Sequence, residues 1–402
     1  MEDVWRRPNV GAPNDTSKAI RRLARGAGKL AERLSRSILL RNLLQMRIAQ
    51  VAPLYESVPP RLYGGTERVV SNLTEELVRQ GHEVTLFASG DSETSAELRP
   101  MCQQALRLQG DKVTDPLAYH ICMIELVAKE TDNFDIVHFH IDYLHFPVSR
   151  RQKIPCVTTL HGRLDIPEIH PLFQEFPDMH LVSISDAQRE PMLWANWAGT
   201  VYHGLPEESF QPRRKPHEYL AFLGRISPEK GVDSAVEIAK RSGIPIKIAA
   251  KVDPADHDFY EEKIRHLLDH PLVEFVGEIG DSEKCEFLSG ARALLFPIDW
   301  PEPFGLVMIE ALACGTPVIA FSHGSVPEII QDGVTGFLVS TVDEAAAAVG
   351  RINDIDRNVC RSVFEQRFSA RRMCSDYLDV YRRLLRSGDP DTRTGEIDPV
   401  AA

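Results

Sequence analysis

The sequence predicts an α/β protein of two doubly wound domains, each a parallel sheet covered by helices on both faces, with a cleft between them. Three observations lead to this prediction. The chain has 402 residues, which exceeds the size of one ordinary compact domain. From about residue 47, short apolar segments of strand length alternate with helical segments, as they do in parallel βαβ units. The alternation breaks at a charged, proline-rich linker, 206–216, and then restarts.

Residues 1–45 differ in composition from the rest of the chain. Within 18–45 there are eight Lys or Arg residues and one acid, Glu32. Apolar residues recur there at helical spacing, which favours a basic amphipathic helix, although two glycines weaken it. Two interpretations remain open: a translation start placed too early, or a helix that contacts a membrane surface through 18–45. We expect 1–45 to be dispensable for catalysis, because the first core strand begins only after Met46.

The first domain is expected over 46–205. Its first strand is followed by a glycine turn and by a helix over 66–80, which Gly81 ends in the left-handed cap position. Further apolar runs follow, with loops or helices between them. The predicted strands are 47–52, 83–88, 135–140, 156–160 and 180–185.

The second domain is expected over 217–365, where the alternation of strands and helices restarts. A final helix within 366–388 carries its apolar residues on one side, and we expect it to pack back on the first domain. The polar tail, 389–402, is expected to be disordered. Ligands of doubly wound domains bind at the carboxyl ends of the strands, so the site should lie in the cleft. The predicted strands are 219–224, 245–250, 273–277, 293–297, 317–321 and 335–339.

Composition excludes several classes of protein. The formal net charge of -12 argues against nucleic acid as the main partner. No apolar run has the length of a transmembrane helix, and no secretory signal pattern is present. The seven cysteines are scattered without a C-x-x-C motif, so we expect reduced thiols and neither a disulfide framework nor a zinc site. The expected compartment is the cytoplasm, with peripheral membrane contact as the alternative.

The most informative segment is WPEPFGLVMIEALACGTPVIAF, residues 300–321. Prolines on both sides of Glu302 hold its carboxylate in a non-helical turn. Gly305 allows a ligand to approach the backbone where the next helix begins, and a helix N-terminus favours a phosphate or sugar hydroxyls. Glu310, about two turns into the helix, is placed to bind a different part of one extended ligand. The structural alternative is that Glu302 caps the helix and Glu310 is solvated on its surface.

A second segment, FLGRISPEKGVD (222–233), places two cations where a strand meets the next helix. Arg225 leaves the carboxyl end of the strand, and Lys230 lies near the start of the helix. A planar guanidinium and a compact ammonium together suit a diphosphate, and they would neutralise the charge that builds on a leaving group without a metal. The alternative for the pair is a solvated basic loop.

Two features of the first domain point to the same cleft. Gly64 and Gly65 follow Tyr63 between the first strand and its helix, where backbone amides can approach a phosphate or an acceptor. His161 closes the strand CVTTL and is placed to hydrogen-bond a donor sugar. A plain strand-to-helix turn and a structural histidine are the respective alternatives.

A histidine cluster offers a different interpretation, a metal site. His138 and His140 share one face of a strand, and Asp142 and His145 follow closely. We favour a structural role, because no ligand set from a second strand is evident. No metal and no other cofactor is therefore expected.

Together these residues resemble the retaining glycosyltransferase family 4, which includes sucrose, glycogen and lipopolysaccharide sugar transferases and has the GT-B fold of two Rossmann-like domains. The resemblance covers Met46 to about Leu385. Its most specific element is the E-x7-E motif from Glu302 to Glu310, and GRISPEKG and TLHG stand where that family has them. YGGTERVV, ASGDSET and GEIGDSEK are similar to a bacterial subgroup that includes antibiotic-tailoring sugar transferases.

The resemblance implies roles for matching residues. Glu302 would hold hydroxyls of the donor sugar, and Glu310 would hold those of the ribose. Arg225 and Lys230 would hold the diphosphate, and His161 would lie beside the sugar. Main-chain groups would complete the donor site, with the strand end near residue 276 lining the base pocket. These implied donor contacts are Phe304, Gly305, Leu306, Gly64, Gly65, Val276 and Gly277.

The function implied is a retaining, metal-independent transfer of a hexose-type sugar from a nucleotide-sugar, with UDP preferred over GDP as the nucleotide. The acceptor, whether a small molecule, a glycan or a lipid-linked species, is not readable because variable loops bind it. Two alternatives are a nucleotide-sugar epimerase of the same architecture and a non-catalytic nucleotide-sugar-binding protein. Slow sugar release from UDP-glucose, epimerisation at C2, or binding without either would tell the three apart.

Overall fold

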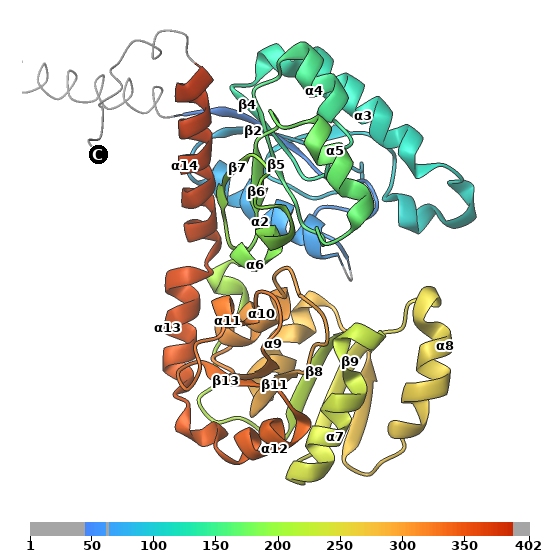
Figure 1. Cartoon of the computed structure of the whole chain (residues 1–402), viewed down its shortest axis with the longest axis vertical. Helices are drawn as coiled ribbons and strands as arrows, with labels where there is room; N and C mark the ends of the chain where they lie inside the picture. The colour runs from blue at the N-terminus through green and yellow to red at the C-terminus, as the bar shows by residue number, and fades with distance from the viewer. Residues whose placement is uncertain (1–44, 62–63, 389–402) are drawn as a thin grey trace, which may run out of the picture. The chain divides into compact units, whose positions relative to one another are not determined.

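Apolar strands of the chain assemble into two parallel sheets, each with helices on both faces (Figure 1). The computed structural model describes residues 45–61 and 64–388. The predicted basic helix within 1–45 and the tail 389–402 lie outside this range, apart from Gln45, so both remain predictions. The described residues from Arg47 onward belong to one compact unit.

The first sheet has seven parallel strands in the order β3-β2-β1-β4-β5-β6-β7. Its central strand, β1, is RIAQV, and all but its first residue are buried, as expected for a strand covered on both faces. In the register of the sheet, Ile48 pairs with Val84 on one side and with Ile136 on the other. The strands are β1 (Arg47–Val51), β2 (Glu83–Ala88), β3 (Glu97–Pro100), β4 (Ile136–Phe139), β5 (Cys156–Thr159), β6 (Leu181–Ser183) and β7 (Trp197–Thr200).

Helices and short 3₁₀ turns connect these strands. The helix α2 (Gly65–Arg79) buries the apolar stripe that the sequence predicts, including Val69, Leu73 and Leu77. It ends before Gly81, whose φ of 91° lies in the left-handed region that favours glycine. The other helices of this part are α3 (Pro116–Glu130), α4 (Phe146–Gln152), α5 (His170–Glu175) and α6 (Asp186–Arg189).

The second sheet has six parallel strands in the order β10-β9-β8-β11-β12-β13. Strand order reverses between β8 and β11, the kind of point at which doubly wound sheets bind ligands. The strands are β8 (Leu220–Arg225), β9 (Ile246–Lys251), β10 (Val273–Gly277), β11 (Ala293–Phe296), β12 (Val318–Phe321) and β13 (Gly336–Val339).

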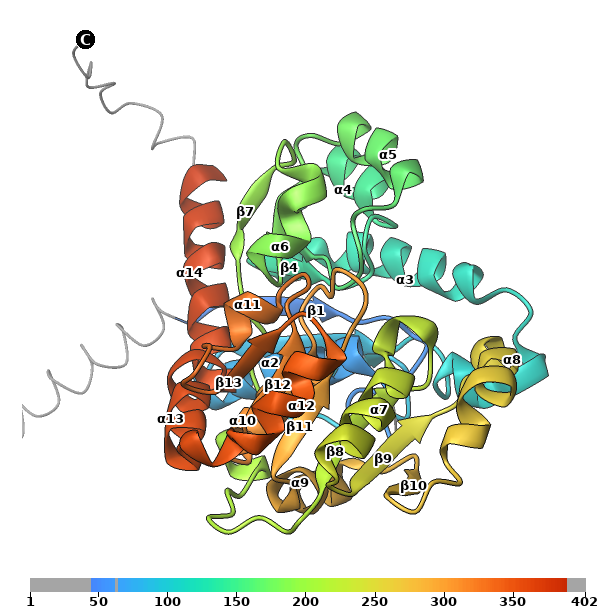
Figure 2. The ribbon, with the colours of Figure 1, turned by 60° about the horizontal axis from the view of Figure 1, so that its bottom comes forward.

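The helices of the second part pack in two groups. The helices α7 and α12 lie side by side against the sheet (Figure 2), and α10 packs against α9 and α13. Gly315, after α10, has a φ of 70°, and a Cβ there would lie 2.9 Å from the backbone oxygen of Arg357. The helices are α7 (Val232–Ser242), α8 (His257–Phe259), α9 (Asp281–Gly290), α10 (Leu306–Ala313), α11 (Val326–Ile329), α12 (Val342–Gly350) and α13 (Arg357–Arg367).

The last helix, α14 (Ala370–Gly388), returns to the first part of the chain and packs against α2. Two backbone hydrogen bonds hold the start of this helix against Leu205. The Leu205 amide donates to the Phe368 carbonyl at 2.9 Å, and the Ala370 amide donates to the Leu205 carbonyl at 2.8 Å. Tyr377 and Tyr381 on this helix are fully buried. α14 therefore contributes polar groups to the interior of the first sheet as well as apolar area.

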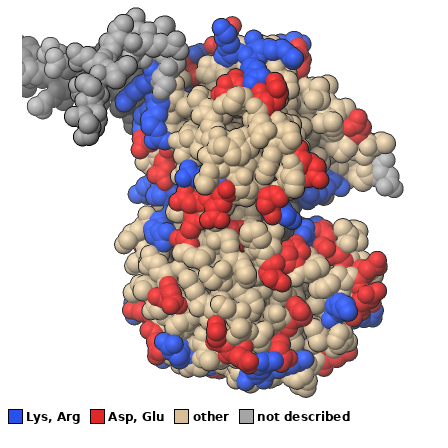
Figure 3. Space-filling view, in the orientation of Figure 1, with Lys and Arg blue, Asp and Glu red and all other residues tan. Residues whose placement is uncertain are grey.

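All the predicted strands are present, with each end within two residues of its predicted position, and among the described residues two further strands, β3 and β7, were not predicted. Among the described residues, no helix combines the length and the apolar character that a membrane span requires. On the face shown in Figure 3, acidic and basic side chains of the described residues gather in small groups of both signs.

Candidate functional site

One cavity at the strand ends of both sheets collects most of the residues that the sequence singles out. Ten of the twelve predicted site residues line it. The remaining two, Val276 and Gly277, do not, although the next residues along the chain, Glu278 and Ile279, do. The predicted residues in the wall are Gly64, Gly65, His161, Arg225, Lys230, Glu302, Phe304, Gly305, Leu306 and Glu310.

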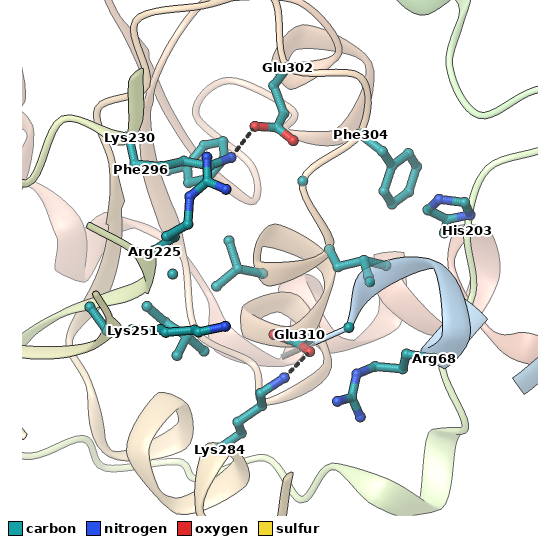
Figure 4. A pocket seen from close by; sticks show the side chains of 18 of the residues that line it. Arg68, His203, Arg225, Lys230, Lys251, Lys284, Phe296, Glu302, Phe304 and Glu310 are labelled. Atoms are coloured by element: carbon teal, nitrogen blue, oxygen red, sulfur yellow. Dashed lines mark hydrogen bonds and ion pairs between the residues drawn. The ribbon is translucent and has the colours of Figure 1, made fainter. Parts of the chain in front are cut away.

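Glu302 is held at the rim of the cavity by its neighbours in the chain and by one distant cation. The residue as a whole is only 8% exposed. Lys230 Nζ donates to Oε2 at 2.6 Å (Figure 4). Trp300 Nε1 donates to the same oxygen at 2.9 Å. The backbone is fixed as well, because Ser325 N donates to the Glu302 carbonyl at 2.9 Å. Glu302 is therefore not a helix cap but a positioned acceptor within the site.

The turn after Glu302 leads into α10 through a residue that only glycine suits. Gly305 has a φ of 78°, and a Cβ there would lie 2.8 Å from Met308 Cε. The first residues of the helix, Leu306 and Val307, line the cavity. The first amides of an α-helix have no intrahelical acceptor and carry a partial positive charge. The start of α10 can therefore bind an anion or hydroxyl oxygens.

Glu310, one turn further along α10, is paired with a lysine that sequence reasoning missed. Lys284 Nζ lies 3.0 Å from Glu310 Oε1, and it comes from α9 (Figure 4). Glu310 is 4% exposed, so it is buried in the wall rather than solvated on the helix surface. Its low exposure in the cavity wall overturns the structural alternative for this residue.

The cavity is rich in cations, although the chain as a whole is acidic. Five of its lining residues are basic and three are acidic. Burial lowers the pKa of Arg68, which reaches the site from α2 and pairs with Asp281. The five basic residues are Arg68, Arg225, Lys230, Lys251 and Lys284. A polyanionic ligand would find a net positive wall here.

Arg225 is more heavily paired than a free diphosphate-binding cation would be. Its guanidinium contacts Glu229 at 2.7 Å, Asp256 at 3.4 Å and Asp253 at 3.7 Å. Glu229 belongs to the same turn as Lys230. The acids hold the guanidinium in one orientation at the end of β8, so an anionic ligand would share this arginine with fixed carboxylates.

His161 enters the wall from the end of β5. Its Nε2 lies 2.9 Å from His140 Nδ1, and its ring stacks on that of His203 at 5.4 Å between centroids. Burial lowers the pKa of His161 to about 3, so the imidazole is neutral at physiological pH. Its Nδ1 is buried without a hydrogen-bond partner among the described residues. The ring is therefore equipped for hydrogen bonding rather than for proton transfer.

Two members of the histidine cluster, His138 and His145, are held by hydrogen bonds to neighbouring side chains. His138 bonds to Tyr381 Oη and to Thr159 Oγ1, both at 2.7 Å. His145 bonds to Ser149 Oγ at 2.8 Å and to Thr158 Oγ1 at 2.7 Å. No three His, Cys, Asp or Glu side chains of the described residues are arranged to hold a metal ion.

Sequence reasoning missed Arg68, Lys251, Lys284 and His203. Lys251 is the last residue of β9, the strand next to β8, so its position directly after a predicted strand is a signal in the sequence. His203 packs on Phe304 at 4.7 Å between ring centroids. The two residues are 101 positions apart in the sequence, so no local pattern predicts this contact. Arg68 and Lys284 lie on helices whose cleft-facing side cannot be known before the fold is.

Comparison with known proteins agrees with this geometry. Residues 63–204 match the family described as Glycosyltransferase Family 4, and residues 206–360 match Glycosyl transferases group 1. An uncharacterised glycosyltransferase of Methanocaldococcus jannaschii is 26% identical over 396 residues, covering 84% of this chain and 98% of the relative.

Solved structures share the fold. AviGT4, a glycosyltransferase of avilamycin A biosynthesis, has a TM-score of 0.66 at 22% identity, with coverage of 86% of this chain and 99% of its own. Anabaena HepE, crystallised with UDP and glucose, has a TM-score of 0.66 at 16% identity, with coverage of 84% and 100%. The chain therefore belongs to the GT4-like glycosyltransferases and has their GT-B fold.

Proposed function

We propose that this glycosyltransferase moves a hexose-type sugar from a nucleotide-sugar, preferentially a UDP-sugar, to an acceptor hydroxyl with retention of anomeric configuration and without a metal ion. One observation carries the proposal. Two buried carboxylates, Glu302 and Glu310, each paired with a lysine, line one cation-rich cavity and are separated by the start of α10.

This arrangement matches the parts of a nucleotide-sugar. A carboxylate accepts hydrogen bonds from adjacent hydroxyls, so Glu302 suits the sugar and Glu310 suits the ribose. Lys230, Arg225 and the amides at the start of α10 suit the diphosphate between them. The complex of HepE with UDP and glucose is the reason to test UDP-sugars first.

In the reaction, the bond between the anomeric carbon and the diphosphate oxygen breaks while the acceptor oxygen forms its bond to the same carbon. The acceptor proton passes to the leaving phosphate, so no protein carboxylate has to act as a base. Lys230 and Arg225 would stabilise the negative charge that grows on that phosphate. Retention rests on the family resemblance, and neutral His161 is consistent with a binding role.

The acceptor is a small molecule, a glycan or a lipid-linked species. Donor use can be measured without it, because transferases of this kind release sugar slowly to water. A thermal-shift panel of UDP-glucose, UDP-galactose, UDP-N-acetylglucosamine and GDP-mannose identifies the donor, since a bound ligand raises the melting temperature. Proton NMR of the sugar released from the best donor then reports the first anomer formed.

We expect a UDP-sugar to give the largest shift and an α-linked donor to release the α-anomer first. Release of the β-anomer would contradict retention, and a product epimerised at C2 would assign the chain to the epimerase alternative. Binding without any turnover, even with candidate acceptors, would favour the non-catalytic alternative.

A further inference from the structure

A chain of buried polar groups connects the site to the last helix. Gln50, on β1, is fully buried, and its Nε2 donates to Tyr381 Oη on α14 at 3.2 Å. Its Oε1 lies 2.9 Å from His140 Nε2. His140 Nδ1 in turn lies 2.9 Å from His161 Nε2, and His161 lines the cavity.

The direction of each hydrogen bond follows from the amide at one end. An amide oxygen only accepts, so His140 must carry its proton on Nε2 to donate to Gln50. Burial lowers the pKa of His140 well below its usual range, so the ring is neutral and its Nδ1 has no proton. Nδ1 is then an acceptor, and His161 donates to it from Nε2. Neutral His161 is left with an unprotonated Nδ1, the atom without a partner.

We infer that Gln50 and His140 are positioning residues that fix His161 in the Nε2–H tautomer, so that its Nδ1 accepts a hydrogen bond from a hydroxyl of the donor sugar. This inference rests on the proposed function for the identity of the ligand, but the tautomer itself does not. The network would otherwise have two self-consistent directions, because turning the Gln50 amide over exchanges every donor and acceptor.

The structure places the Gln50 amide in the direction that this inference needs, with Nε2 toward Tyr381 and Oε1 toward His140. The Tyr381 hydroxyl accepts from Gln50 Nε2 and donates its own proton to His138 Nδ1, 2.7 Å away. His138 then donates from Nε2 to Thr159 Oγ1 at 2.7 Å. Each of these groups is buried, so bulk water cannot replace any of these hydrogen-bond partners.

The tautomer can be observed directly in the full chain. Nitrogen-15 NMR of histidine-labelled protein distinguishes protonated from unprotonated imidazole nitrogens, and His161→Asn assigns the signals. The expected result is an unprotonated Nδ1 and a protonated Nε2 for His161. A protonated Nδ1 in the wild-type protein would overturn the inference, whatever its ligand proves to be.

The consequence for catalysis is tested with UDP-glucose and its monodeoxy analogues in the donor-hydrolysis assay. The analogue that lacks the hydroxyl bound by His161 loses one hydrogen bond, so the wild type should use it with a kcat/KM about tenfold lower than that for UDP-glucose. Gln50→Leu removes the acceptor for His140, so it should lower kcat/KM for UDP-glucose by about the same factor. It should cause no further loss for that one analogue, while the affinity for UDP stays within about twofold.

Two tyrosine variants provide a matched pair if Gln50→Leu does not fold. Tyr381→Phe frees the Gln50 amide and should reproduce the loss, whereas Tyr377→Phe should not. Tyr377 lies one turn away on the same helix, is equally buried and bonds to Thr159 at 2.9 Å instead. Equal losses in the two variants would show general damage to the core and overturn the inference.

If the wild-type protein does not bind UDP-glucose, the proposed donor is wrong. The NMR result still decides the tautomer of His161 in that case.

Discussion

Lys230 Nζ lies 2.6 Å from Glu302 Oε2, so the cation predicted for the diphosphate and the carboxylate predicted for the sugar are bonded to each other. Both side chains are largely buried, at 17% and 10% side-chain exposure. A diphosphate that binds to Lys230 must share the ammonium with Glu302. The two residues therefore act as a pair, and substitution of one changes the charge that the other presents to a ligand.

Glu302→Gln is the first test of this pair. The amide no longer neutralises Lys230, so we expect UDP to bind as tightly as in the wild type or up to about tenfold more tightly. Donor hydrolysis should fall by about 100-fold, because the carboxylate for the sugar is lost. Calorimetry with UDP and the hydrolysis assay measure the two effects. A clear loss of UDP affinity would show that Glu302 binds the nucleotide rather than the sugar.

Glu310→Gln should behave in the opposite way and weaken UDP binding by about tenfold or more, because the ribose belongs to UDP itself. Its partner makes a stricter test possible. Lys284→Met removes the cation that is hydrogen-bonded to the buried Glu310 carboxylate, and the double variant removes both charges. A double-mutant cycle on stability should give a coupling of about 1–3 kcal/mol. Additive effects would mean that the 3.0 Å contact contributes nothing to stability.

Most of the fold was predictable because the central strands are buried on both faces and appear as continuous apolar runs. The two missed strands lie at the edges of the first sheet. Glu97–Pro100 has no buried residue and ends in a proline, and Trp197–Thr200 is half-buried throughout. These two strands lack an apolar signal of their own, whereas the edge strands of the second sheet, β10 and β13, carry one and were predicted.

The site was predictable where chemistry is local in sequence and not where it depends on the fold. Glu302, Gly305 and Glu310 lie within nine residues of one another, so their motif is visible in the chain. The lysine partners of Glu302 and Glu310 are 72 and 26 residues away in the sequence, so the spacing of the motif cannot predict them. Arg225 was predicted as a diphosphate ligand, but its three acidic neighbours are visible only in the structure.

Donor hydrolysis should persist in EDTA. Five cationic side chains and the start of α10 line the cavity, and we expect them to stabilise the leaving diphosphate in place of a divalent metal. Lys230→Gln and Arg225→Gln should each reduce turnover more than they reduce binding of the intact nucleotide-sugar, because negative charge grows on the phosphate as its bond to the sugar breaks. Loss of activity in EDTA that magnesium or manganese restores would contradict this prediction.

The protein should lose stability in mild acid. Burial lowers the pKa of His145 to about 3, whereas an unfolded histidine titrates near 6.5. Between these values the unfolded state binds a proton that the folded state does not, so the free energy of unfolding falls as pH decreases. Each such histidine contributes about 1.4 kcal/mol per pH unit below about pH 6.

Urea unfolding at several pH values from 7 to 5 measures this slope. His145→Gln should be less stable at pH 7, because the ring stacks on Phe139 at 3.6 Å between centroids. It should nevertheless show a shallower dependence on pH, by about one proton. An unchanged slope would show that His145 titrates normally in the folded protein.

Cys285 should react with iodoacetamide at a lower pH than an ordinary thiol. It is partly exposed on α9, and Gln211 N donates to its Sγ at 3.1 Å. Hydrogen bonding from Cys314 is the largest influence, and with the Gln211 amide and the charges of Arg213 and Arg361 it lowers the pKa of Cys285 to about 6. Only the thiolate attacks, so the rate should rise as pH increases through about 6 and then level off.

Peptide mass mapping after short exposures between pH 5 and 9 gives this profile for each cysteine, and Cys285→Ser identifies the peptide. Cys314→Ala supplies the sharper comparison, because it removes the hydrogen bond and leaves the amide and both arginines in place. The midpoint for Cys285 should then move upward in pH. If the wild-type midpoint lies near 9, or if it does not move in Cys314→Ala, the Cys314 side chain does not control the reactivity of Cys285.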